Sequence, residues 1–379
     1  MERSMARSEN LASDEASRSS ASAKTGKSAG RIRELELLRA FAIGAVVLIH
    51  STAGATVELA SGSRSQLLYL IINQMSSFAV PVFIMLSGIV LFYRYNNRWS
   101  LSEAVSFYRK RIQYIVIPYV LWSLFYSFFY PWLFKTVSLK AWSFDTFLNQ
   151  LLWGKASYHL YFMVIIIQLY AIFPLVMTLV HRFSVFRHLL PFIGLAVQAG
   201  AYAYRYYGNG LPHGASLAVT YAFVFSVGGW IGLNYDRFRQ WLHSYSWVAS
   251  AAAVAVGSAY TMLHIVSPFG IRFGWETEAI LFHLYGATAT VGLLVLCTHL
   301  LNHWTGLTRV LMSIGGVSFG IYFVHPALLA VFRTYLVAPA GSLLYHALTI
   351  GGFFIVFLLS WGFSSGSKPL YGSWVILGK

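Results

Sequence analysis

The sequence predicts an all-α integral membrane protein with about ten transmembrane helices and both termini in the cytoplasm. Hydrophobic residues make up 57% of the 379 residues and charged residues only 10%, whereas a soluble domain has roughly a quarter charged residues. The apolar residues gather in segments of about 20, the length that crosses a bilayer core of ~30 Å as a helix. Lysine and arginine are concentrated between alternate segments, and this sets the predicted orientation.

Ten segments have the length and composition of a membrane span. A shorter mixed stretch, 139–153, predicts a helix at the membrane surface instead of a span. The ten predicted spans are 35–55, 66–93, 111–134, 158–180, 189–207, 214–234, 246–265, 277–300, 310–336 and 343–366.

The distribution of lysine and arginine predicts that both termini are cytoplasmic. With the N-terminus placed inside, 19 of the 27 basic residues fall on the cytoplasmic side and 7 outside, and Arg39 lies within the first span. Cytoplasmic loops are enriched in these residues. The same loops account for the net charge of +15, so we expect no nucleic-acid partner.

Composition divides the chain into three parts. Residues 1–30 are rich in serine and alanine, carry charges of both signs and lack an apolar signal-peptide core, which predicts a disordered cytoplasmic tail. Residues 31–370 form the predicted membrane domain, and 371–379 a short cytoplasmic tail. The single cysteine, Cys297, excludes a disulfide framework.

Arg39 and His50 are unusual residues for a membrane helix. They are eleven residues apart, about three turns, so they share one helix face with a rise of roughly 16 Å between them. Residues 40–49 are all apolar or glycine. A cation and an imidazole are costly in lipid, so this face is expected to look into a protein interior or a wet cavity.

Other ionisable residues are predicted to lie at similar or shallower depths. In the predicted topology His50 lies about 22 Å across the membrane and His325 about 24 Å. His159 falls at the outer mouth of its span, and Glu276 and Glu278 start another span from outside. No acidic residue falls in the core of a predicted span, which argues against a proton pump.

The chemistry that remains is a buried histidine acting as a general base. No HExxH motif is present, and we expect neither a metal site nor a serine nucleophile. Five cations lie within eighteen residues of the second predicted cytoplasmic loop. This cluster suits the phosphates of a nucleotide-containing donor, although inner loops are basic for topological reasons alone. The five are Arg94, Arg98, Arg109, Lys110 and Arg111.

Four blocks of the sequence resemble the acyltransferase-3 family of integral membrane acyltransferases. The first is IRELELLRAFAIGAVVLIH at 32–50, with arginine and histidine in the family's spacing and Glu36 where an acidic residue, commonly aspartate, is usual. The others are VPVFIMLSGIVL at 80–91, followed by a basic segment, YHLYFMVIIIQLYAIFPL at 158–175, and SFGIYFVHPAL at 318–328. The last two blocks look most like the branch that includes poly-N-acetylglucosamine-type membrane proteins.

The resemblance implies transfer of an acyl group, usually acetyl, from cytoplasmic acetyl-coenzyme A (acetyl-CoA) to a hydroxyl of a cell-surface polysaccharide or lipid-linked glycan. Carried over to this chain, His50 is the catalytic histidine and Arg39 its paired arginine, and the five loop cations hold the nucleotide. The resemblance also implies a bacterial inner membrane location and other polysaccharide-synthesis proteins as partners. The residues expected to support His50 or bind the acceptor are Glu36, His159, Glu276, Glu278 and His325.

Several alternatives stay open at this point. Arg39 also fits a structural pair with Glu36, and His325 also fits a ring bonded to a carbonyl near Pro326. His50 acts as a general base or carries the acyl group covalently, and the acyl group is acetyl or another such as succinyl. Rival functions are a glycan transporter or flippase, and a non-catalytic membrane subunit of a polysaccharide-synthesis machine.

Overall fold

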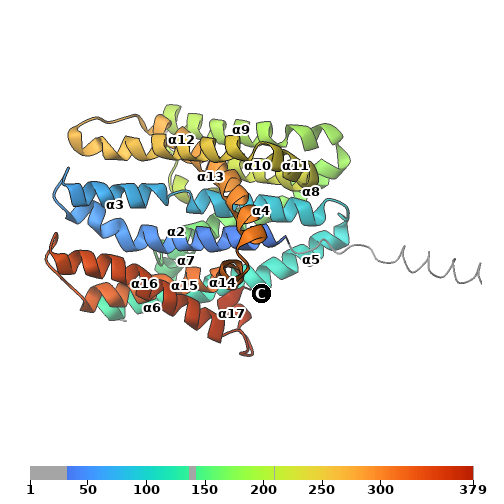
Figure 1. Ribbon diagram of the computed structural model, residues 1–379. Coiled ribbons are helices and arrows are strands. Elements are labelled where there is room, and N and C mark those ends of the chain that lie inside the picture. Colours follow the sequence, from blue (N-terminus) through green and yellow to red (C-terminus); the bar gives the residue numbers. More distant parts are fainter. Residues whose placement is uncertain (1–31, 136–141, 209, 379) are drawn as a thin grey trace, which may run out of the picture. The chain divides into compact units, whose positions relative to one another are not determined.

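The fold is given by a computed structural model, which describes residues 32–135, 142–208 and 210–378. The predicted tail 1–30 and residues 139–141 of the predicted surface helix lie outside these ranges. Within them every regular element is helical, and the described residues from Arg33 onward group into one compact unit. Figure 1 shows that most of the long helices of this unit run side by side along a common direction.

The helical elements include one π-helical turn (η1) and three short 3₁₀ turns (η3, η4 and η5). In chain order they are α2 (Arg33–Glu58), α3 (Arg64–Met75), α4 (Ala79–Tyr95), α5 (Leu101–Arg111), η1 (Ile112–Val116), α6 (Ile117–Phe134), α7 (Phe144–Trp153), α8 (Tyr161–Arg182), α9 (Ser184–Tyr207), η3 (Gly214–Ser216), η4 (Ala218–Tyr221), α10 (Ala222–Leu233), α11 (Tyr235–Ser244), α12 (Ser246–Ile265), η5 (Ser267–Phe269), α13 (Trp275–His303), α14 (Thr305–Gly316), α15 (Ser318–Tyr335), α16 (Leu343–Gly366) and α17 (Trp374–Leu377).

The predicted all-α membrane fold is confirmed, with a smaller number of clear spans than ten. Among the described residues, seven helical stretches are long and apolar enough to cross a membrane, or eight if the bent pair α14–α15 is one span. The two other predicted spans are helical, but 218–233 is short and α9, with arginine near both ends, is not among the seven. The orientation of the termini stays a prediction.

Helix α2 occupies the middle of the bundle. It contacts α3, α4, α13, α14, α15 and α16, and Figure 1 shows it between the α3–α4 layer and the α15–α16 layer. Glu34 and Glu36 lie in its first turn, where acidic side chains favour the positive end of the helix dipole. Most residues between Leu35 and Thr52 of α2 are therefore buried or half-buried among other helices.

Glycine allows the closest helix pair, α4 and α10, to pack backbone against backbone. A Cβ added at Gly228 would lie 2.2 Å from the Met85 carbonyl oxygen, and one at Gly88 would lie 2.4 Å from the Phe225 carbonyl oxygen. Small residues at such positions are typical of membrane helix contacts. Gly88 and Gly228 are thus packing residues of this helix pair.

Two irregularities in the helices, a π-helical turn and a sharp bend, lie beside residues of the functional site. The turn η1 follows Arg111 and precedes Pro118, which has no N–H to donate to the preceding turn; π-helical turns are frequent at functional sites. Helices α14 and α15 meet at a bend of 72°. Gly315 fits there because a Cβ would lie 2.0 Å from the Glu36 carbonyl oxygen.

Candidate active site

Three histidine rings lie together inside the bundle, and we call them the histidine cluster. His50 comes from α2, His159 from the turn before α8, and His325 from α15. The His50 and His325 rings stack with their centroids 5.5 Å apart, and the His325 and His159 rings lie 5.7 Å apart, edge to face. His159 and His325 are buried, and His50 is half-buried. The structure therefore brings together three residues that the sequence predicted separately.

The His325 ring is fixed in one tautomer. Its Nδ1 lies 2.9 Å from the Ile321 carbonyl oxygen, and because a carbonyl only accepts, Nδ1 carries the hydrogen and the neutral ring keeps a lone pair on Nε2. This Nε2 is buried and has no hydrogen-bond partner among the described residues. A buried acceptor without a partner is costly, so the site is arranged for a ligand or a proton.

His159 is anchored through two hydrogen bonds, one of which continues to Tyr130. Its Nδ1 lies 3.0 Å from Ser157 Oγ, which lies 2.9 Å from the Tyr130 hydroxyl. Its carbonyl oxygen accepts a hydrogen bond of 2.6 Å from the Tyr322 hydroxyl. In the described part of the chain its Nε2 is buried without a partner, like that of His325.

Side chains from two other helices hold the backbone around His50. Arg333 donates hydrogen bonds of 2.9 Å and 3.1 Å to the carbonyl oxygens of His50 and Ser51, and Asn73 donates one of 2.8 Å to the Ile49 carbonyl oxygen. The Tyr158 ring lies 4.6 Å from the His50 ring. Sequence reasoning had counted Arg333 only as an outer-loop cation. The sequence signal that could have placed Arg333 at this site was its position eight residues after His325, close to the same helix face.

Arg39 lines a cavity of about 250 Å³, which we call the Arg39 cavity. Its walls come from α2, α4, α5, α8, the α14–α15 bend and the chain end at Leu377 and Gly378. Arg39 donates a hydrogen bond of 2.9 Å to Glu36, as one of the sequence-based alternatives proposed. Tyr322 lines the same cavity and its ring lies 4.9 Å from that of His159. The Arg39 cavity thus reaches a ring that touches the histidine cluster.

Only one of the five predicted nucleotide-binding cations lines the Arg39 cavity. Arg111 does so, and its guanidinium lies 4.6 Å from the Tyr170 ring centroid, a cation–π arrangement. The four others are exposed at the surface: Arg94, Arg98, Arg109 and Lys110. Arg39 and Arg111 therefore form the cationic part of this cavity, a pairing that the loop cluster did not predict.

The face of α2 between Arg39 and His50 does not line a channel. Ile43 and Val47 are fully buried, and Val46 is 5% exposed within the main hydrophobic core. The Arg39 cavity follows α4, α8 and α15 instead, past Ser87, Phe162 and Tyr322. Of the two expectations for this face, a protein interior or a wet cavity, the structure agrees with the protein interior, because these apolar side chains pack against neighbouring helices.

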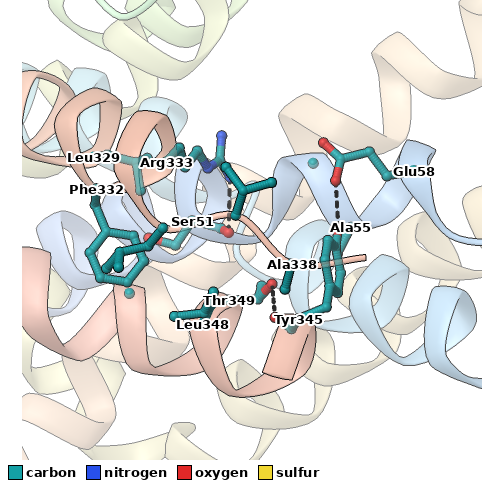
Figure 2. Close-up of a pocket in the computed structure, with 14 residues that line it drawn as sticks. Ser51, Ala55, Glu58, Leu329, Phe332, Arg333, Ala338, Tyr345, Leu348 and Thr349 are labelled. Atoms are coloured by element: carbon teal, nitrogen blue, oxygen red, sulfur yellow. Dashed lines mark hydrogen bonds between the residues drawn. The ribbon is translucent and has the colours of Figure 1, made fainter. Parts of the chain in front are cut away.

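Two further cavities lie at the other end of α2, beyond the histidine cluster. The first, the Tyr158 cavity, has a volume of about 680 Å³ and is lined by Tyr130, Phe134, Tyr158, Pro326, Leu329, Ala330, Arg333 and Thr334. The second, the Glu58 cavity, has a volume of about 210 Å³ and lies between the ends of α2 and α15 and the start of α16. Figure 2 shows Ser51, Glu58, Arg333 and Tyr345 around this second cavity.

Glu276 and Glu278 lie outside this arrangement. Glu276 lines a separate cavity with Tyr202 and His283, and Glu278 lies 3.5 Å from His264. The structure does not place either carboxylate with the histidine cluster. Their predicted role in acceptor binding has no geometric support here.

Two sequence patterns concern the expectation that the protein has neither a metal site nor a serine nucleophile. His299 and His303 have HxxxH spacing on α13, which sequence reasoning missed, but no group of three candidate metal ligands forms among the described residues. Gly316–Gly320 matches GxSxG, which was also missed. Its Ser318 begins α15 at the α14–α15 bend and not at the strand-to-helix turn that this motif requires.

The fold and the site together define an integral membrane protein with a buried histidine cluster between separate cavities. A family profile described as "Acyltransferase domain" matches residues 32–365. The chain belongs to the acyltransferase-3 family and is a membrane acyltransferase.

Two curated relatives of the chain are staphylococcal proteins. The chain is 24% identical to a Staphylococcus aureus protein named "Probable poly-beta-1,6-N-acetyl-D-glucosamine export protein" over 309 residues, which cover 78% of this chain and 82% of that relative. It is 26% identical to a Staphylococcus epidermidis protein of the same name, covering 78% and 81%. No solved structure matches the chain significantly.

Proposed function

We propose that this protein transfers an acetyl group from acetyl-CoA to a hydroxyl of a cell-surface polysaccharide. The donor binds in the Arg39 cavity from the cytoplasm, and the acceptor enters the Tyr158 cavity from the other side of a bacterial inner membrane. The observation that carries the proposal is the position of the histidine cluster, which touches Tyr322 of the first cavity and Tyr158 of the second.

The charge of the Arg39 cavity supports a phosphate-bearing donor. Arg39 and Arg111 line it, and its described lining contains no carboxylate. Helix α15 begins at Ser318 on the cavity wall, and the N-terminus of a helix favours an anion through its N–H groups and dipole. Arginine binds phosphate oxygens in pairs. Phe162 and Tyr322 then offer an apolar and aromatic path toward the histidine cluster.

The chemistry assigned to the histidine cluster is general base catalysis by His50. The imidazole takes the proton from the acceptor hydroxyl, the oxygen attacks the thioester carbonyl, and the C–S bond breaks. The same proton passes to the sulfur of the leaving coenzyme A, so the products are an ester and a free thiol. His325 stacks on His50 and so helps to hold the ring that takes the proton.

The acceptor follows from the relatives and from the Tyr158 cavity. Relatives named for export of poly-β-1,6-N-acetylglucosamine make an N-acetylglucosamine polymer the first acceptor to test. Aromatic rings of Tyr130, Phe134 and Tyr158 line the cavity, and flat rings suit the apolar faces of sugars. Other polysaccharide-synthesis proteins are the expected partners.

The printed names of the relatives favour a second candidate function, glycan export. An exporter moves the polymer across the membrane without consuming a thioester. The two functions therefore differ in one measurable product, free coenzyme A.

Purified protein with acetyl-CoA and β-1,6-linked N-acetylglucosamine oligosaccharides tests the proposal by release of free thiol. We expect release that depends on the acceptor and an acetyl ester on the sugar. His50→Ala is expected to lower the rate at least about a hundredfold. His283→Ala removes another buried histidine, outside the cluster, and is the matched control. Glycan translocation without thiol release would contradict the proposal and favour export.

A further inference from the structure

The Glu58 cavity has no role in the chemistry assigned above, although it begins one residue after His50. It is lined by Ser51 and Glu58 of α2, Arg333 of α15, and Tyr345 and Thr349 of α16. Figure 2 shows the polar atoms of these residues around one hollow. Its volume of about 210 Å³ is below the roughly 300–1,000 Å³ of pockets for drug-sized ligands, so it suits one small unit.

The polar groups of the Glu58 cavity are available to a ligand. Ser51 is 3% exposed, and its Oγ has no hydrogen-bond partner among the described residues. The Tyr345 hydroxyl donates a hydrogen bond of 2.7 Å to Glu58, which leaves the other carboxylate oxygen to accept. No ion pair joins Glu58 to Arg333 in the described chain. The cavity therefore presents both donors and acceptors.

The Glu58 cavity and the Tyr158 cavity share two lining residues. Arg333 and Leu329 line both cavities. The Arg333 guanidinium is also hydrogen-bonded to the carbonyl oxygens of His50 and Ser51. A ligand that passes over Arg333 would occupy both cavities and contact the residue that binds the His50 carbonyl oxygen.

The charged residues of the Glu58 cavity indicate which kind of ligand it can bind. Glu58 and Arg333 contribute one negative and one positive charge to the Glu58 cavity, whereas a phosphate site needs an excess of cations. Hydroxyl groups both donate and accept, so they match a carboxylate, a guanidinium, a tyrosine and a serine together. The chemistry fits a neutral, hydroxyl-rich unit.

We propose that the Glu58 cavity is a second sugar subsite, which holds the unit next to the one that is acylated. The acceptor is then an oligosaccharide or polysaccharide chain and not a single sugar. This inference rests on the proposed function and deepens it, since it assigns Glu58, Tyr345 and Arg333 to chain recognition.

The test compares N-acetylglucosamine with its β-1,6-linked oligomers of two to six units, using the full-length protein in nanodiscs. We expect kcat/KM to rise with the second or third unit and then level off. Glu58→Gln and the milder Tyr345→Phe should lower kcat/KM for the oligomers about tenfold, more than for the single sugar. Asp145→Asn removes an exposed carboxylate elsewhere and is the charge-matched control.

The outcomes separate this inference from the proposed function. Transfer that does not depend on chain length, with both variants equal to the control, would overturn the second subsite alone. No transfer to a sugar of any length would overturn the proposed function and this inference with it. A length dependence that Tyr345→Phe reduces without changing the KM for acetyl-CoA would support the subsite.

Discussion

At the scale of single residues, the site is defined by which cations and imidazoles the fold brings to a cavity. His50 is held in place through its backbone, because Arg333 and Asn73 bind the carbonyl oxygens at and beside it. His325 is held through Nδ1 and keeps Nε2 toward the cluster. Arg111 faces the Arg39 cavity, whereas Lys110, one residue before it, is exposed.

The pair Arg111 and Lys110 provides a residue-scale prediction. Arg111→Gln should raise the KM for acetyl-CoA about tenfold, because it removes a guanidinium that binds phosphate in the cavity. Lys110→Gln removes the same charge from the surface and should leave KM within about twofold. Steady-state kinetics with varied acetyl-CoA measures both. Equal effects of the two substitutions would show that the donor is held by the net charge of the loop.

The sequence predicted part of this site, and the rest could not be predicted for physical reasons. Depth along the helices placed His50 and His325 at one level, because rise per residue is fixed. Selection of Arg111 from five cations depends on side-chain direction and on η1, which the loop's composition does not reveal. In the sequence, Arg333 looks like a basic residue whose position reflects membrane topology alone. Its functional contact was not predicted, because the hydrogen bond to the His50 carbonyl oxygen joins residues 283 positions apart.

At the scale of elements, apolar length predicted where the helices lie, and packing decided how they meet. All ten predicted segments are helical. The sequence predicts one continuous span over 310–336, because it remains apolar throughout. The structure instead has a bend of 72° between α14 and α15. The closeness of α4 and α10 depends on glycines whose missing side chains contact backbone.

Gly228 gives a prediction for this helix pair. Gly228→Ala would place a Cβ 2.2 Å from the Met85 carbonyl oxygen, and such overpacking costs about 1–3 kcal/mol. We expect a lower thermal unfolding midpoint in detergent. Gly200→Ala on α9, where nothing lies within 4 Å of the added Cβ, is the control and should leave the midpoint equal or higher. A Gly228→Ala protein as stable as the control would contradict the close packing.

At the scale of the molecule, α2 links two separate cavities through one buried cluster. The Arg39 cavity and the Glu58 cavity lie near opposite ends of this helix, about 28 Å apart by the helical rise. Composition predicted a membrane protein, and helix geometry placed Arg39 and His50 on one face of its first span, roughly 16 Å apart. The Arg39 cavity extends along α4, α8 and α15, and apolar side chains fill the face of α2 itself.

The central claim is that donor and acceptor reach the histidine cluster from opposite sides of the membrane. Sealed proteoliposomes with radiolabelled acetyl-CoA inside and β-1,6-linked N-acetylglucosamine oligosaccharide outside test it directly. We expect labelled ester on the external sugar, and loss of that label with His50→Ala. Labelled ester formed only when donor and acceptor are on the same side of the membrane would contradict it.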